Sequence, residues 1–165
     1  MPKLIKDGAI VDDGFTFANP AEDGSFTLPA GPVLVKLATW QAHRDALLAH
    51  PHAKGVQLAP AEFAEEIASD LDKLALIAIE FPGFADGRGY STAHLLRGRL
   101  GFKGELRAVG DVFKDTLFYQ QRCGFNAFAV KEGKSLEDAL EALHAFQTPY
   151  QGSAEKPGLL FRTQA

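Results

Sequence analysis

An α/β fold built on a mostly parallel sheet is the fold class that this sequence predicts, and three observations support it. Five strand patterns are each followed by a helical pattern, with a repeat of about 23 residues that is typical of strand–helix–strand units. The third strand pattern, residues 74–80, is a nearly continuous apolar run, which a parallel strand covered on both faces requires. A chain of 165 residues suits one domain but is too short for a closed barrel of eight units, which needs about 200 residues. A partial barrel and a doubly wound open sheet remain, and we favour the partial barrel because each strand leads directly into a short helix.

The individual elements follow from local patterns along the chain. Residues 1–32 are rich in Asp, Gly and Pro and predict an N-terminal arm of turns with one small hairpin. A single α/β domain is expected over residues 33–150, and a tail over residues 151–165. The expected strands are residues 33–38, 55–59, 74–80, 105–109 and 127–130. The expected helices are residues 40–50, 61–71, 91–100 and 112–122, with a last helix from residue 135.

Particular residues support the helix assignments. Phe63, Ile67 and Leu71 recur every fourth residue and mark one face of the predicted second helix. Ser135 is a good N-cap for the last helix. Gly124 suits the left-handed position that ends the helix before it, and the neighbouring Cys123 is then expected to be a small buried residue.

Composition excludes several classes of protein. A net charge of −4 without a basic patch argues against a nucleic-acid binder, and the longest apolar run is far too short to cross a membrane. A single cysteine excludes an internal disulfide framework and a metal cluster held by several thiolates of this chain. With no signal-peptide pattern, we expect a protein of the reducing cytoplasm. The five histidines lack ligand spacing, so no metal site is expected, and no residue pattern identifies a cofactor.

The loop after the third strand is the strongest candidate site, because ligands of parallel α/β folds bind at the carboxyl ends of strands. This loop, residues 80–91, is the longest of its kind and leads into a helix N-terminus, which attracts anions. Its polar residues are Glu80, Asp86, Arg88, Tyr90 and Ser91. Arg88, Tyr90 and Ser91 are the expected anion ligands, and Glu80 and Asp86 are candidate catalytic carboxylates. The alternative is structural: Asp86 makes a turn and Ser91 caps the helix.

The fourth strand adds a second arginine to this prediction. Glu105 and Arg107 lie two residues apart and therefore on one face of the strand. A buried Arg107 needs a carboxylate or an anion, and Glu80 is the expected partner. A structural ion pair and a catalytic or anion-binding clamp both remain open for Arg107. Asp111 follows as a further candidate anion-site residue, although capping of the next helix is the favoured role. If the third and fourth strands are neighbours, Arg88 and Arg107 share one oxyanion crevice.

Four segments together resemble a known bacterial family. They are FPGFADGRGYS at residues 81–91, LLRGR at 95–99, GELRAVGD at 104–111 and RCGFNAF at 122–128. Over nearly the whole chain, the sequence resembles DUF934, a family of unknown function whose members are often labelled as oxidoreductases of sulfite reduction. The resemblance implies a setting beside assimilatory sulfite reductase, but no mechanism and no catalytic residues. The oxidoreductase label fits poorly, because no nucleotide fingerprint is present and any electron transfer would need a borrowed cofactor.

Three functions follow from these residues and this resemblance. The first is an accessory protein of assimilatory sulfite reduction that binds an oxyanion or small cofactor, with sulfite reductase or another sulfur-assimilation component as its partner. The second is a small enzyme with carboxylate acid–base chemistry. The third is a non-catalytic structural or interaction subunit. A homodimer is also expected, because a partial barrel leaves strand edges and an apolar inner face to be covered. The N-terminal arm and the apolar residues 159–161 are the alternative cover within one chain.

Overall fold

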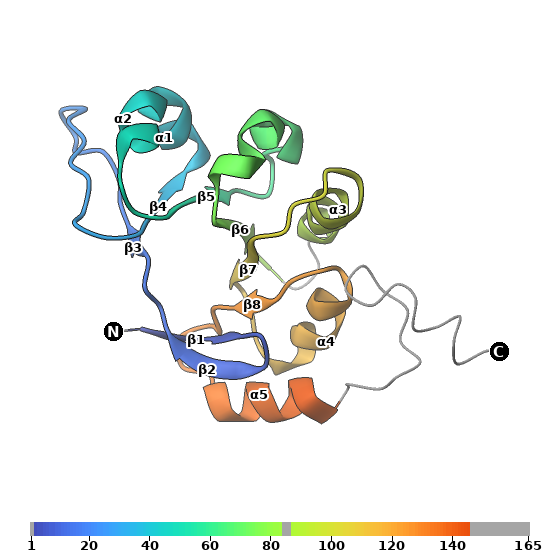
Figure 1. The fold of residues 1–165 in the computed structure, drawn as a ribbon. Coiled ribbons are helices and arrows are strands. Elements are labelled where there is room, and N and C mark those ends of the chain that lie inside the picture. The colour runs from blue at the N-terminus through green and yellow to red at the C-terminus, as the bar shows by residue number, and fades with distance from the viewer. Residues whose placement is uncertain (1, 84–86, 146–165) are drawn as a thin grey trace.

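One eight-stranded sheet organises the computed structural model, which describes residues 2–83 and 87–145 (Figure 1). The strands are β1 (Lys3–Lys6), β2 (Ala9–Asp12), β3 (Thr16–Phe17), β4 (Val33–Lys36), β5 (Lys54–Leu58), β6 (Leu76–Phe81), β7 (Glu105–Gly110) and β8 (Ala127–Phe128). Their spatial order is β2-β1-β8-β7-β6-β5-β4-β3. From β3 to β8 every neighbouring pair is parallel, whereas β1 runs antiparallel to both β2 and β8. The mostly parallel sheet and all five predicted strands are therefore confirmed.

The strand order identifies the sheet as a half-barrel. A doubly wound sheet reverses its order at a switch point, but β3 to β8 follow one another in sequence without a reversal. Right-handed crossovers then place every helix on the same face. Figure 1 shows the helices arranged along the outer, convex side of the curved sheet. Of the two expected architectures, the structure has the partial barrel.

From β4 to β8 the helices connect successive strands, α5 follows β8, and most helices differ in detail from the prediction. They are α1 (Leu37–Ala42), α2 (Arg44–Ala49), the 3₁₀ helix η1 (Ala64–Lys73), α3 (Arg88–His94), the π-helical turn η2 (Leu95–Arg99), α4 (Lys114–Arg122) and α5 (Leu136–Ala145). The first expected helix is broken at His43, whose backbone is not helical. Ser135 caps α5 as predicted, since its Oγ accepts the amide hydrogen of Asp138 at 3.1 Å. No helix in the described residues is long and apolar enough to span a membrane.

The core lies between the convex face of the sheet and the helices. Along β6, Ile77 and Ile79 point toward this core, and Leu76 and Ala78 point to the concave face. Trp40 of α1 is fully buried on the helix side. Both faces of β6 are thus apolar and covered, which explains the continuous apolar run in its sequence.

The N-terminal arm contributes to the sheet at both edges. The predicted hairpin is present as β1 and β2, joined by Asp7 and Gly8, which both have the positive φ of a type I′ turn. This hairpin pairs with β8, and after it the chain crosses to the other edge, where β3 pairs with β4 (Figure 1). On the way, Phe15 packs against Leu34, Leu76 and Ala78. The arm therefore covers part of the concave face within one chain.

Candidate functional site

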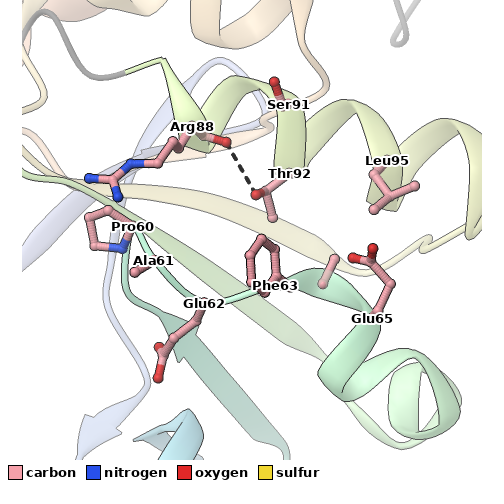
Figure 2. Close-up of a pocket in the computed structure, with 10 residues that line it drawn as sticks. Pro60, Ala61, Glu62, Phe63, Glu65, Arg88, Ser91, Thr92 and Leu95 are labelled. Carbon is pink, nitrogen blue, oxygen red and sulfur yellow. Dashed lines mark hydrogen bonds between the residues drawn. The ribbon is translucent and has the colours of Figure 1, made fainter.

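A pocket of about 380 Å³ lies where β5 and β6 lead into η1 and α3. This is the carboxyl end of two neighbouring parallel strands, the usual position of ligand sites in such folds. The residues that line the pocket are Pro60, Ala61, Glu62, Phe63, Ala64, Glu65, Arg88, Ser91, Thr92 and Leu95 (Figure 2). We call it the η1–α3 pocket.

One wall of the pocket exists because α3 approaches β6 closely. A Cβ atom on Gly89 would lie 2.6 Å from the Phe81 ring and 3.1 Å from Ile79, closer than side-chain carbons pack. Glycine at this position therefore allows the first turn of α3 to rest directly on the strand. That contact positions Arg88 and Ser91, on the same turn, beside the opening of the pocket.

The opposite wall is the chain that enters η1. Glu62 Oε1 accepts the Ala59 amide hydrogen at 2.6 Å, and Glu66 Oε2 accepts that of Phe63 at 3.1 Å. These bonds hold the turn so that Phe63 is 65% exposed. The prediction that Phe63 shares a helix face with Ile67 is wrong, because Phe63 precedes the helix and the turns that follow are 3₁₀ rather than α.

The pocket is apolar in the middle and oppositely charged at its ends. Figure 2 shows the Arg88 guanidinium above Pro60 at one end, the Glu65 carboxylate beside Leu95 at the other, and the Phe63 ring between them. An arginine at the rim of an apolar pocket can bind a carboxylate, phosphate or sulfonate, while the apolar walls bind the body of the molecule.

The predicted loop residues divide between two sides of α3. Arg88 and Ser91 line the pocket, but Tyr90 packs the other way, with its ring 5.0 Å from Phe81 and 4.9 Å from Tyr119. Burial raises the pKa of Tyr90 above its usual value. Ser91 does not cap the helix, since α3 begins at Arg88. Asp86 lies outside the described residues.

Arg107 is buried and belongs to an ion network on the concave face. Its Nε donates to Glu105 Oε2 at 2.7 Å, and its Nη1 donates to Asp13 Oδ2 at 3.1 Å. Lys6 Nζ lies 3.1 Å from the other oxygen of Glu105. The expected Glu80 partner is wrong, because Arg107 pairs in register with Ala78 and Glu80 lies two residues farther along. The network joins two cations to two carboxylates, which favours the structural role left open for Arg107.

The two arginines of the predicted oxyanion crevice lie on opposite faces of the sheet. Helix α3 packs on the face of Ile79, whose neighbour in register is Ala108, so the adjacent Arg107 points away from α3. Asp111 pairs with Lys131, Oδ1 to Nζ at 3.1 Å. It does not cap α4, which begins three residues later. The structure therefore brings together Arg88 and Ser91, but not Arg107, Glu80 or Asp111.

Arg97 is an important residue that the sequence interpretation missed. Its side chain donates hydrogen bonds to backbone and side-chain oxygens of described residues that precede β7 and β8. The acceptors are the carbonyl oxygens of Gly124, Phe102 and Gly104 and the Oδ1 of Asn126, at 2.8 to 3.1 Å. Arg97 and its acceptors all lie in or beside the segments that resemble the family. This shared position in the sequence could have indicated that they contact one another.

Cys123 is buried at the end of α4, as predicted. Burial raises the pKa of its thiol to about 11, which keeps it protonated and unreactive. Among residues 2–83 and 87–145, no group of three or more His, Cys, Asp or Glu side chains is placed to hold a metal ion.

Fold and pocket together define a half-barrel α/β protein with a small pocket at the carboxyl ends of β5 and β6. The DUF934 family model, described as a bacterial protein of unknown function, matches residues 55–161, well over half of the chain. The chain therefore belongs to the DUF934 family. The matched region includes both walls of the η1–α3 pocket and Arg97 with its acceptors, but not the N-terminal arm. No curated protein matches the sequence.

Proposed function

We propose that this protein is an accessory protein of assimilatory sulfite reduction that binds a small oxyanion-bearing molecule in the η1–α3 pocket. The observation that carries the binding role is Arg88 at the end of an apolar pocket, at the carboxyl ends of parallel strands. The metabolic setting comes from the family resemblance, since DUF934 members are often labelled for sulfite reduction. Sulfite reductase or another sulfur-assimilation component is the proposed partner.

Binding is favoured over catalysis by the kinds of residue that meet in the pocket. Its titratable side chains are Arg88, Glu62 and Glu65. Glu62 is held by the backbone of Ala59, and a guanidinium does not act as a base at neutral pH. The acid–base alternative required Glu80 in the same cleft, and Glu80 lies on the concave face.

The charge distribution also selects among ligands. A bidentate guanidinium contact favours a planar or tetrahedral oxyanion at the Arg88 end. The Glu65 carboxylate at the other end repels a free inorganic anion. An oxyanion carried on an apolar body binds best, because its apolar part occupies the space beside Phe63 and Leu95.

Calorimetric titration tests this binding mode with four probes: sulfite, sulfate, phosphate and benzenesulfonate. Benzenesulfonate is expected to bind more tightly than the inorganic anions. Arg88→Ala is expected to weaken it about tenfold or more, since a charge-assisted hydrogen bond contributes about 1.5–3 kcal/mol. Phe63→Ala is expected to weaken the binding of benzenesulfonate alone.

The matched control is Arg99→Ala, which changes an exposed arginine on the following π-helical turn that does not line the pocket. Equal binding by wild type and Arg88→Ala, or no binding at millimolar concentration, contradicts the proposed site.

A genetic experiment tests the metabolic setting separately. Deletion of the gene is expected to slow growth on sulfate as sole sulfur source and to leave growth on cysteine unchanged. Complementation with the wild-type chain and with Arg99→Ala should restore growth on sulfate, and Arg88→Ala should not. Unimpaired growth of the deletion strain on sulfate would contradict the setting while leaving the binding result intact.

A further inference from the structure

The two ends of the η1–α3 pocket carry opposite charges along one helix face. Arg88, Thr92 and Leu95 follow one another at spacings of four and three residues, so they lie on the same face of α3 and of the turn after it. At a rise of roughly 1.5 Å per residue, this wall is about 10 Å long from Arg88 to Leu95. Figure 2 shows the Glu65 carboxylate beside Leu95, at the end opposite to Arg88. A ligand that fills the pocket therefore meets a cation at one end and an anion at the other.

Glu65 has a different position from the two other glutamates at the entry of η1. Glu62 accepts the amide hydrogen of Ala59, and Glu66 accepts that of Phe63, so both carboxylates act within the turn. Glu65 belongs to the first turn of η1, and its carboxylate borders the pocket instead (Figure 2). Its charge therefore bears on what the pocket binds.

The surroundings of Glu65 favour a cationic group. The ring of Phe63 lies between the two ends of the pocket, and an ammonium group beside an aromatic ring is attracted by the negative charge of the ring face. The Glu65 carboxylate attracts the same group and can accept its hydrogen bonds. A second anion at this end of the pocket would instead be repelled.

We propose that the ligand of the η1–α3 pocket is dipolar, with an oxyanion at Arg88, an apolar middle beside Phe63 and an ammonium group at Glu65. This inference rests on the proposed oxyanion-binding function and deepens it by naming the class of ligand. A single ring with one charged group at each end fits a wall of this length. Glu65 is then the residue that distinguishes an amino-bearing oxyanion from a simple one. Because Glu65 is exposed, the preference is moderate in size.

Calorimetric titration with 4-(aminomethyl)benzenesulfonate, benzenesulfonate and benzylamine tests this inference, since the first probe carries both charges and the others carry one each. The dipolar probe is expected to bind to the wild type about fivefold more tightly than benzenesulfonate, which corresponds to one partly solvated ion pair. Benzylamine is expected to bind most weakly, because it lacks the group that Arg88 binds. Glu65→Gln is expected to remove the preference for the dipolar probe without weakening benzenesulfonate.

A charge reversal distinguishes a direct contact from an effect on the shape of the pocket. Glu65→Lys is expected to invert the preference, so that 1,4-benzenedisulfonate binds more tightly than 4-(aminomethyl)benzenesulfonate. The matched control is Asp72→Asn, which changes an exposed carboxylate on the same 3₁₀ helix that does not line the pocket. This variant should keep the preference of the wild type.

The outcomes separate this inference from the proposed function on which it rests. If benzenesulfonate binds through Arg88 but the dipolar probe binds no more tightly, this inference is overturned and the oxyanion pocket stands. It is also overturned if Glu65→Gln keeps the preference for the dipolar probe. If neither sulfonate binds to the wild type, the proposed function fails and this inference fails with it. Loss of the preference in Glu65→Gln, together with its inversion in Glu65→Lys, supports the dipolar ligand.

Discussion

Arg97 Nε lies 2.8 Å from the carbonyl oxygen of Gly124, so an arginine after α3 closes the turn that ends α4. Gly124 has φ of 113°, and its amide donates to Gln121 while that of Phe125 donates to Gln120, a Schellman ending. A Cβ atom on Gly124 would lie 2.5 Å from Arg97 Cγ. Glycine is needed here both for the backbone conformation and for the room that the arginine occupies.

We expect Arg97→Lys to lower the free energy of unfolding by about 2–3 kcal/mol, because an ammonium group cannot reach all four acceptors and leaves carbonyl oxygens without donors. Urea denaturation measures this change. Arg99→Lys, an exposed substitution on the same π-helical turn, should change stability by about 0.5 kcal/mol or less. Equal stability of the two variants would show that the hydrogen bonds of Arg97 to the segments before β7 and β8 do not stabilise the fold.

Arg107→Ala is expected to cost about 3–5 kcal/mol, because it leaves the buried Glu105 and the partly buried Asp13 without their shared cation. The side chain of Arg107 is only 4% exposed, so water cannot replace the lost contacts. Limited proteolysis should also cut faster near residues 13–17, since the arm loses its attachment to β7. Lys131→Met is the control: it removes an exposed ion pair with Asp111 and should cost less than about 1 kcal/mol. If Arg107→Ala unfolds at the wild-type urea concentration, the network is not structural.

Asp70 makes the free energy of unfolding depend on pH in the acidic range. The Arg44 guanidinium, together with the Trp40 indole N–H, lowers the pKa of Asp70 from 3.8 to about 2. Because the folded pKa is below the unfolded one, its contribution is complete above about pH 4 and is lost as pH falls toward 2. We expect it to be about 1–2 kcal/mol, since Arg44 is partly solvated.

The corresponding measurement compares wild type with Asp70→Asn by urea denaturation from pH 7 down to pH 3. The stability difference should be largest at neutral pH and should shrink below about pH 4. Asp72→Asn, an exposed carboxylate on the same 3₁₀ helix, should show no comparable trend. A difference that grows as the solution becomes more acidic has the wrong sign for this interpretation.

Cys123 should resist alkylation in the folded protein. At pH 8 a thiol with a pKa of about 11 is about one part in a thousand thiolate, and burial blocks the reagent as well. Mass spectrometry after iodoacetamide treatment should find little modification without urea and complete modification in denaturing urea. Rapid stoichiometric labelling of the folded protein would contradict the buried position.

Local sequence patterns were sufficient for much of the fold. The apolar run that became β6 predicted a covered parallel strand, because such a strand meets apolar neighbours on both faces. Ser135 and Gly124 marked helix ends through conformations and hydrogen bonds that involve only nearby residues. At the site, the loop order predicted that Arg88 and Ser91 lie together at a strand end.

The remaining features depend on contacts between distant parts of the chain. Phe63 fits a helical apolar spacing, yet the turn held by Glu62 and Glu66 exposes it. The partner of Arg107 could not be identified locally, because Asp13 lies 94 residues earlier in the sequence.

The sequence by itself thus determined the five strands from β4 to β8, that the sheet is mostly parallel, and the helix-terminal roles of Ser135 and Gly124, since backbone conformation and burial pattern are local properties. Only the tertiary structure decided that the arm pairs with both edges of the sheet and that Arg88 and Arg107 lie on opposite faces of it. The physical reason is that pairing and ion partners depend on which surfaces remain uncovered once the half-barrel has formed.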